Sequence, residues 1–399
     1  MAVRHGYGKI AGTDALVFAY DTGDTVNSYK GEPTTNYTTD SGILQNGWSG
    51  GFSLLDSSTK SFQLNVSNFH TDNRGWRSFM WDMRAHAGSA VTISATVEVP
   101  SDSPGDFAWV MIGQANTRDS GTTTATYLGY SSASERYQKS TSNTERITWS
   151  GIVGNTGTAN QPNGIIGFTM WYNGGTIGTN SFIKVSNVQI ELKSHATQFV
   201  NGTRSVSGSL FDLTGNSSVD LSNVSFDSNA DINLDGTDDY IETADSSLLD
   251  LTTDMSFEFV VNADSSQGNL YPRLIDKSIY LIHITQTSPF TIAQNITTSG
   301  GLRQTALGSA FTAGEYTHIV TTYDGRYGQI FVNGDLKYTR DFSTELACNT
   351  NSTSVRIGGD GSINRPLNGQ LPISKIYNRV LSAAEVQSNY RHYKNRFGI

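Results

Sequence analysis

Hydrophobic and polar residues alternate along short stretches of this chain, a pattern that places alternate side chains on opposite faces of a β-strand. Residues 91–99 show this alternation, and residues 107–112 form a continuous apolar run typical of a fully buried strand. Similar runs recur at 146–153, 165–172 and 182–192, with Gly- and Asn-rich turns between them. The pattern predicts an all-β chain built from sandwiches.

A second series of strands follows the polar stretch at 202–209. Residues 329–332 and 336–338 form two short strand-like runs separated by Asn333-Gly334. Asn-Gly between two strands is typical of a type I′ hairpin, because both turn residues must adopt positive φ. All six tryptophans precede this second series, so the two series are expected to build separate cores.

One helix is predicted near the end of the chain. Ser382 and Glu385 have the spacing of a capping box, in which each side chain accepts a hydrogen bond from the other residue's backbone N–H. Leu381 and Val386 supply the matching hydrophobic staple. The helix is expected to run from about residue 383 to residue 394.

The composition narrows the classes of function. With 27 basic against 36 acidic side chains the net charge is −9, so the chain has no general positive field to hold a nucleic acid backbone. No stretch approaches the ~20 apolar residues of a membrane span, and the N-terminus lacks the apolar run of a signal peptide. Cys348 is the only cysteine, which excludes an internal disulfide. We therefore expect no nucleic acid and no membrane partner.

Five stretches of the second series share a recognisable succession of strands and turns: 234–241, 255–261, 316–325, 330–334 and 375–386. Together they resemble the laminin-G-like, concanavalin-A-like lectin and glucanase sandwiches. The resemblance implies a lectin-like sandwich. The predicted fold class is therefore all-β, with two β-sandwich (jelly-roll) domains, one of them lectin-like, and a short C-terminal helix.

One motif of this family is split. Residues 18–31 lie far before residues 210–216, although the two segments adjoin in phage versions of the domain. The stretch between them, from about 36 to 200, resembles carbohydrate-binding-module-like sandwiches of virion proteins, chiefly at 183–192 and 196–204.

The interpretation of the split motif is an insertion. An N-terminal arm would cover 1–13, a discontinuous lectin-like sandwich 14–35 plus 205–399, and an inserted sandwich 36–200. The strand around Ala15 to Tyr20 is then expected to pair with residues after Leu210.

The last stretch of the chain, residues 389–399, resembles the ends of structural proteins of tailed bacteriophages. This resemblance implies a place on the virion surface, other virion proteins as partners, and a homo-oligomer, for which a trimer is one option. The predicted function is a head decoration, collar or tail-fibre component that binds host-surface glycan without cleaving it. Two alternatives stay open: a purely architectural virion protein that binds no glycan, and a glycan depolymerase.

The expectation that the chain is not an enzyme rests on its carboxylates. Glucanases that share this sandwich carry a Glu-x-Asp-x-Glu strand, and no such triplet occurs here. Glu258 lies in a plausible strand but has no acidic residue two positions away. It is therefore expected to be part of the framework, and no catalytic residue is predicted.

Candidate glycan-binding residues come from a dense group of aromatic and hydrogen-bonding side chains: Asn73, Arg74, Trp76, Arg77 and Trp81. Exposed aromatic rings stack on sugar faces, and amide and guanidinium groups bond to sugar hydroxyls. The alternative for the tryptophans is a buried strand, because two apolar residues precede Trp81.

Candidate metal ligands lie in the segment 231–242, where Asp231, Asn233, Asp235 and Glu242 fit the spacing of a calcium loop. Hard oxygen donors at alternate positions and a final bidentate carboxylate suit Ca²⁺, the cofactor that this loop would hold. The alternative is a plain strand, turn and strand of the lectin-like domain.

The C-terminal segment is a candidate docking element, because basic and apolar residues are concentrated there. Cations in the last turn favour a helix dipole, but an apolar, basic tail needs something to pack on. The residues expected to contact a neighbouring subunit or virion protein are Tyr390, Arg391, Tyr393, Lys394, Arg396 and Phe397.

Overall fold

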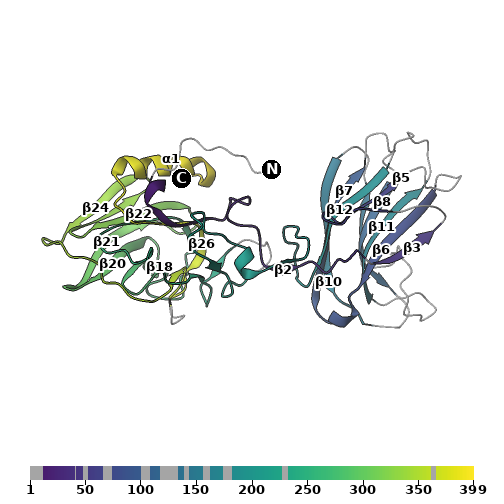
Figure 1. Cartoon of the computed structure of the whole chain (residues 1–399), viewed down its shortest axis with the longest axis horizontal. Coiled ribbons are helices and arrows are strands. Elements are labelled where there is room, and N and C mark those ends of the chain that lie inside the picture. The colour runs from purple at the N-terminus through teal and green to yellow at the C-terminus, as the bar shows by residue number, and fades with distance from the viewer. Residues whose placement is uncertain are drawn as a thin grey trace. The chain divides into compact units, whose positions relative to one another are not determined.

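The structure is a computed structural model, and it describes residues 12–40, 42–47, 53–65, 74–99, 108–116, 134–138, 143–155, 162–173, 182–226, 232–360 and 365–399. The predicted fold class is confirmed, since the described residues form β-sheets and one α-helix near the C-terminus (Figure 1). Short 3₁₀ turns lie at Thr13–Ala15, Arg84–His86 and Val206–Gly208. Within this part of the chain, no helix has the length and apolarity needed to cross a membrane.

The chain divides into two compact units, and the first contains the described residues of Met1–Glu32, Ser205–Asp227 and Asp231–Ile399. One of its sheets, the helix-covered sheet, has the strand order β1-β26-β17-β22-β23-β24, with β15 also paired to β26. Its strands are β1 (Leu16–Asp21), β15 (Leu234–Asp235), β17 (Asp254–Ala263), β22 (Thr317–Asp324), β23 (Tyr327–Val332), β24 (Asp335–Asp341) and β26 (Asn368–Tyr377).

The other sheet of the first unit, the open sheet, has the order β14-β16-β25-β18-β19-β20-β21. Its strands are β14 (Val219–Asp220), β16 (Ile241–Thr243), β18 (Arg273–Asp276), β19 (Tyr280–Ile284), β20 (Phe290–Thr298), β21 (Gly301–Phe311) and β25 (Val355–Ile357). The inner faces of the two sheets enclose one apolar core that includes Phe18, Phe257, Tyr280 and Ile292. This arrangement is a β-sandwich.

Helix α1 (Ala383–Phe397) covers the outer face of the helix-covered sheet (Figure 1). It begins with the predicted capping box, in which the Ser382 hydroxyl and the Glu385 carboxylate accept from each other's backbone N–H. Val386 packs against Val320 and Phe331 of the sheet. The capping signals are therefore confirmed.

Strand β1 pairs antiparallel with β26, so the N-terminal strand belongs to the same sheet as residues after Leu210. The two parts of the split motif meet beside it. Tyr29 forms a β-bridge with Leu210, and the backbone N–H of Ala19 donates to Asp212 Oδ1 at 2.9 Å. Because the two segments pair within one sandwich, they can form one structural motif although they lie far apart in the sequence.

The hairpin between β23 and β24 has the predicted two-residue turn. Asn333 and Gly334 have φ values of 50° and 83°, as a type I′ turn requires. The glycine is also needed for space, because a Cβ at position 334 would lie 2.2 Å from the Gln387 side chain of α1. This turn therefore lies directly against the helix.

The second unit contains the described residues of Pro33–Arg204. It has two five-stranded sheets, with the orders β10-β7-β12-β5-β4 and β3-β6-β11-β8-β9. The strands are β3 (Ile43–Gly47), β4 (Ser53–Asp56), β5 (Ser61–Asn65), β6 (Arg74–Asp82), β7 (Ala90–Val99), β8 (Ala108–Asn116), β9 (Ser134–Gln138), β10 (Asn143–Ile152), β11 (Pro162–Asn173) and β12 (Phe182–Glu191).

The segments that enter and leave the second unit pair with each other. Strand β2 (Thr34–Thr35) is antiparallel to β13 (Thr203–Arg204). The buried Glu191 holds the first of them, since Thr34 Oγ1 donates to its carboxylate at 2.8 Å. Both ends of this unit are therefore fixed at one place in its fold.

Candidate functional site

A groove of about 290 Å³ lies on the outer face of the open sheet. Side chains of successive strand residues point to opposite faces of the sheet. Ile282 and Ile292 point into the core, so their neighbours point outward and line the groove. His283 of β19 pairs with Ala293 of β20, and Ala293 pairs in turn with Ala306 of β21. Small side chains in this row leave room above the sheet.

An aromatic ring forms one wall of this groove. Tyr271 comes from the loop before β18 and is 41% exposed. The Arg365 guanidinium lies 5.3 Å from its ring centroid, and the His283 ring meets it edge-on at 5.1 Å. Arg273 fixes the loop by donating to the Tyr271 carbonyl at 3.1 Å. The tyrosine is thus held in place while much of it stays accessible.

Polar side chains form the opposite wall. Asn295 of β20 and Gln304 of β21 are cross-strand partners, and Gln304 Nε2 donates to Asn295 Oδ1 at 3.0 Å. Beyond this bond the pair keeps amide donors and an amide acceptor. Two threonines, Thr285 and Thr291, add hydroxyl groups to the lining. The groove therefore combines an aromatic face with neutral hydrogen-bonding groups, as a saccharide site requires.

His283 is a buried titratable group in the lining of this groove. Burial and the nearby positive charge of Arg273 lower its pKa from 6.5 to about 4, and Arg365 adds to the effect. The imidazole is therefore neutral at neutral pH.

We expect acid to destabilise the first unit through His283. In the unfolded chain this residue takes up a proton near pH 6.5, but in the fold only near pH 4. Between these values the unfolded state binds more protons, so the free energy of unfolding falls as the pH falls. Between pH 6.5 and pH 4, the free energy of unfolding of His283→Gln should fall by up to about 3 kcal/mol less than that of the wild type. Urea denaturation across the window measures it, with His86→Gln of the second unit as the control. An unchanged slope in His283→Gln would contradict the assignment.

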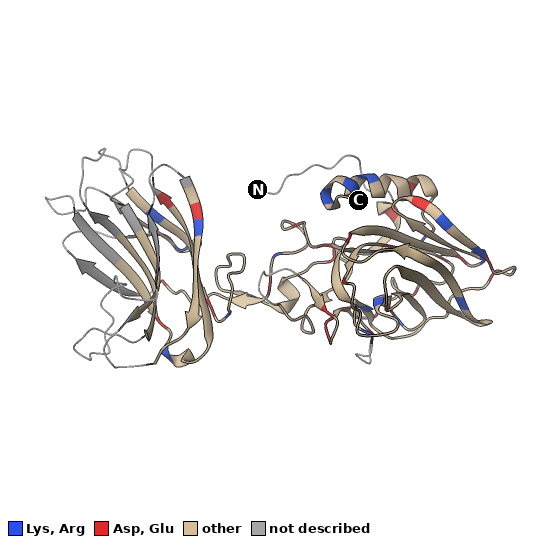
Figure 2. Cartoon of the chain, turned by 180° about the vertical axis from the view of Figure 1, so that it is seen from behind, with Lys and Arg blue, Asp and Glu red and all other residues tan. Residues whose placement is uncertain are grey.

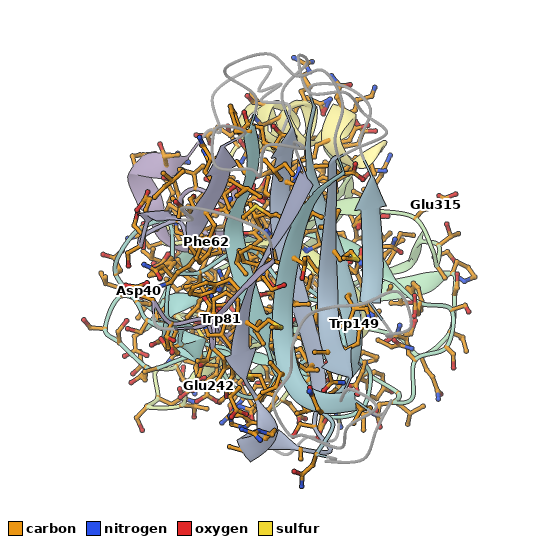
Figure 3. All side chains as sticks on the ribbon, turned by 90° about the vertical axis from the view of Figure 1, so that its right-hand side faces the viewer. Asp40, Phe62, Trp81, Trp149, Glu242 and Glu315 are labelled. Atoms are coloured by element: carbon orange, nitrogen blue, oxygen red, sulfur yellow. The ribbon has the colours of Figure 1, made fainter. Side chains whose placement is uncertain are left out.

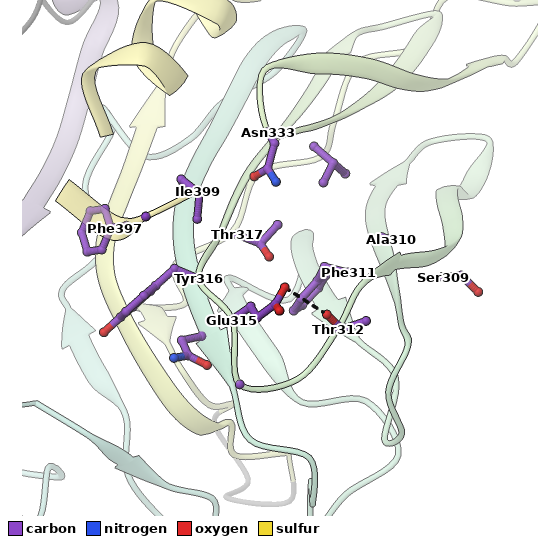
Figure 4. A pocket seen from close by; sticks show the side chains of 14 residues that line it. Ser309, Ala310, Phe311, Thr312, Glu315, Tyr316, Thr317, Asn333, Phe397 and Ile399 are labelled. Atoms are coloured by element: carbon purple, nitrogen blue, oxygen red, sulfur yellow. Dashed lines mark hydrogen bonds between the residues drawn. The ribbon is translucent and has the colours of Figure 1, made fainter. Parts of the chain in front are cut away.

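A larger groove, of about 680 Å³, lies beside the end of helix α1 (Figure 4). Its functional groups contact one another. Thr312 Oγ1 and Glu315 Oε2 are 3.5 Å apart, the rings of Tyr316 and Phe397 pack at 5.0 Å, and the Tyr316 hydroxyl bonds to Gln370. Because these side chains already contact one another or Gln370, the groove on the open sheet is the better candidate.

The predicted glycan-binding residues are not supported as one site. Asn73 lies outside the described residues, as do the side chains of Arg74, Trp76 and Arg77 on β6. The prediction for Trp81 is wrong. Its ring is 4% exposed and packs in the core of the second unit near Phe62 (Figure 3), and Nε1 donates to the Thr39 carbonyl at 3.0 Å. The alternative of a buried strand explains it.

The described residues do not support the predicted calcium site. Asp231 lies outside the described residues, and Glu242 points to a different partner, since its carboxylate lies 2.6 Å from Arg356 Nε. The structure instead brings together Asp235, Asp238 and Asp239, whose oxygens lie within 4.8 Å of one another.

These aspartates have structural roles of their own. Asp235 Oδ1 accepts from the backbone of Thr237 at 2.7 Å. The buried Asp239 accepts from Ser225 and from the backbone of Asp235. Burial raises the pKa of Asp239. The spacing of a calcium loop therefore coincides here with a strand, a turn and a strand, and Glu242 as a ligand is wrong.

The docking prediction is wrong for one of its six residues, the buried Tyr393, and two others have contacts within their own unit. Tyr393 is buried against Val260 and Ile373, and Phe397 packs on Tyr316, while Arg396 forms two hydrogen bonds with Asp21, at 2.6 and 2.7 Å. The apolar, basic tail is therefore ordered by its own sandwich.

Contacts with a partner remain a prediction for the other five residues, Tyr390, Arg391, Lys394, Arg396 and Phe397. Arg391 and Lys394 are exposed, and the basic residues of α1 are visible in Figure 2. Lys394 lies over the Tyr390 ring at 5.9 Å.

Glu258 is a framework residue, fully buried beneath α1. Its carboxylate accepts from His318 Nε2 at 2.8 Å, Asn389 Nδ2 at 3.1 Å and the Tyr377 hydroxyl, and it pairs with Lys375 Nζ at 3.3 Å. Burial raises the pKa of Glu258, but Lys375 and His318 outweigh it, and the pKa falls to about 2. This ionised cluster joins three strands to the helix and has no access to a substrate.

A second buried ion, Lys277, fills a cage of oxygens at the turn between β18 and β19 of the open sheet. Its side chain is fully buried and its Nζ pairs with Asp245 and, at 3.2 Å, with Asp250. The carbonyl oxygens of Asn351 and Thr353 lie at 3.0 and 3.1 Å. Sequence reasoning missed this cage, because its oxygens come from separate loops.

Sequence reasoning also missed the groove on the open sheet. The strand patterns at 280–284 and 290–298 indicate outward-facing polar residues, but the register that aligns Asn295 with Gln304 is set by pairing between strands.

A comparison with protein families agrees with the fold of the first unit. Residues 235–387 match the family described as the concanavalin A-like lectin/glucanases superfamily. Similar solved structures include the binding domain of Paraclostridial Mosquitocidal Protein 1, with a TM-score of 0.39 and 16% identity over 47% of this chain and 50% of that chain. Another is the botulinum neurotoxin serotype G binding domain, with a TM-score of 0.38 and 16% identity over 46% and 48%.

The chain spans about half the length of these solved structures. No curated protein sequence matches it. The chain contains a lectin-like β-sandwich domain of the concanavalin A-like type.

Proposed function

We propose that this chain is a glycan-binding protein and that the groove on the open sheet holds the saccharide. The observation that carries the proposal is the accessible Tyr271, fixed between Arg365 and His283 and facing a groove lined by amides and hydroxyls. Sugar rings have C–H faces that pack on aromatic rings and hydroxyls that bond to amides. The family match in the same unit supports this choice.

Binding without cleavage is part of the proposal. Glycoside hydrolysis commonly needs two carboxyl groups on either side of the scissile bond. The described residues that line the groove include no carboxylate. Glu258, the buried acid of the helix-covered sheet, is enclosed by hydrogen-bonding partners. These features favour a lectin over a depolymerase.

Tyr271→Ala should weaken saccharide binding about 10-fold or more, which corresponds to ~1.4 kcal/mol. The variant loses the ring on which the sugar packs, whereas Tyr271→Phe keeps the ring and should bind nearly as well as the wild type. A glycan array with the wild-type protein identifies a ligand, and titration calorimetry measures the affinities.

Tyr338→Ala is the matched control for this series, because Tyr338 is 39% exposed on β24 of the other sheet. Equal binding by Tyr271→Ala and the wild type would exclude this groove as the site. If the array shows no bound saccharide at all, the architectural alternative is favoured.

The proposed setting is the surface of a tailed-phage virion, in a head decoration, collar or tail fibre. This part rests on the resemblance of residues 389–399 to phage structural proteins. Antibodies against the chain should label purified particles in electron micrographs, and mass spectrometry should detect the chain in them. Its absence from purified particles would exclude this setting.

A further inference from the structure

Resting on the proposed function, we infer that the groove selects an acidic saccharide, whose anionic group is bound by the Arg365 guanidinium beside the Tyr271 ring. The inference depends on the charge of the lining, on the partners of its two arginines and on how Arg365 is held.

The charge of the lining is opposite to that of the chain. The whole sequence has 36 acidic and 27 basic side chains, with a net charge of −9. The described lining of the groove has two guanidinium groups and no carboxylate, and its one imidazole, that of His283, is neutral at neutral pH. A concave site lined by one sign of charge attracts ligands of the other sign. An acidic ligand is the one that such a groove favours.

The two arginines differ in what they contact. Arg273 is largely buried and its Nε lies 2.8 Å from Asp276 Oδ2, so its charge is already matched within the fold. For Arg365, no carboxylate of the described residues lies within ion-pair distance. Arg365 is therefore the cation available to a ligand.

The position of Arg365 suits an anion. Its guanidinium lies over the Tyr271 ring, with its central carbon 5.3 Å from the ring centroid. A cation–π contact of this kind does not use up the N–H donors of the guanidinium, so they can bind other partners. These donors match the two oxygens of a carboxylate, and also those of a sulfate. A sugar on Tyr271 would place such a group within reach, while Asn295 and Gln304 bond to hydroxyls.

The experiment compares three probes on the intact chain by titration calorimetry: oligogalacturonate, its neutral methyl ester and a sulfated galactan oligosaccharide. The acid and the ester share one sugar backbone and differ in charge. We expect the wild type to bind an anionic probe at least 10-fold more tightly than the ester, and to lose this preference at high salt.

The variants locate the preference. Arg365→Gln should bind acid and ester equally, with the affinity of the wild type for the ester. Arg365→Lys should keep part of the preference, because lysine retains the positive charge but lacks the two coplanar N–H donors that match a carboxylate. Tyr271→Ala should weaken all probes alike. Tighter binding of the sulfated probe would identify sulfate as the anionic group and supports the inference.

Three outcomes overturn the inference. Equal affinity of the wild type for acid and ester shows that charge is not selected, and a preference that survives in Arg365→Gln places the selection elsewhere. In both cases the proposed function stands if ester binding depends on Tyr271. Lack of binding to all three probes overturns the inference, and an array without any bound saccharide overturns the proposed function as well.

Discussion

Replacing Glu258 with Gln should lower the free energy of unfolding of the first unit by about 3–5 kcal/mol. The variant keeps the shape of the side chain but removes the charge that faces Lys375, a fully buried cation whose Nζ lies 3.3 Å from it. Burial lowers the pKa of Lys375, and Glu258 opposes that effect. Without the carboxylate, the fold must either bury an unpaired ammonium or release its proton.

A double variant separates charge from packing. Glu258→Met with Lys375→Met removes both ions and should recover most of the lost stability, since no charge then lies unpaired. Glu315→Gln, at an exposed loop position, is the control and should change stability little. Urea denaturation measures all three. A single Glu258→Gln variant as stable as the wild type would contradict the role assigned to this cluster.

The same cluster predicts a loss of stability in strong acid. The pKa of Glu258 is about 2 in the fold, against 4.5 for an ordinary glutamate. Its contribution is therefore fully present above pH 4.5 and is lost as the pH falls towards 2. This window lies below that of His283, so the two residues affect different parts of the pH profile.

Lys277→Ala should also cost about 3–5 kcal/mol, because it leaves Asp245 and Asp250 facing each other without a cation. The space that opens is lined by these carboxylates and by backbone oxygens of Asn351 and Thr353. Hard oxygen donors of this kind suit Ca²⁺. Millimolar Ca²⁺ should therefore raise the melting temperature of Lys277→Ala.

Two controls test whether the ammonium takes the place of a metal ion. The wild type should not respond to Ca²⁺ through this cage, because Lys277 fills it. Lys277→Met fills the space with apolar atoms and should be destabilised without rescue. Equal responses of Lys277→Ala, Lys277→Met and the wild type in differential scanning calorimetry would show that the cage holds no cation other than the lysine.

Local patterns in the sequence predicted the features that depend on neighbouring residues. The capping box at Ser382 and the turn at Asn333-Gly334 are both present, because a few adjacent residues determine them. The helix extends past the predicted Lys394 to Phe397, where Gly398 ends it in a left-handed conformation. That glycine was a usable signal for the end of the helix.

Features that depend on strand register were beyond prediction. The calcium spacing failed because Glu242 lies on a strand and pairs across the sheet with the strand of Arg356, which no local pattern specifies. Trp81 was placed in a site although strand alternation buries it. The groove residues come from four strands and three loops, and only the three-dimensional fold brings Tyr271, Arg365 and Asn295 together.

The pairing of β1 with β26 has a consequence for biosynthesis. The Tyr20 hydroxyl donates to the carbonyl of Leu371, 351 residues later in the chain. At roughly 5–20 residues per second, a ribosome needs tens of seconds to make the intervening polypeptide. The second unit, whose two ends meet at β2 and β13, can fold during that interval. Strand β1 has no partner strand until β26 has been synthesised. Chaperones that shield exposed strands should therefore matter most for this protein while it is still attached to the ribosome.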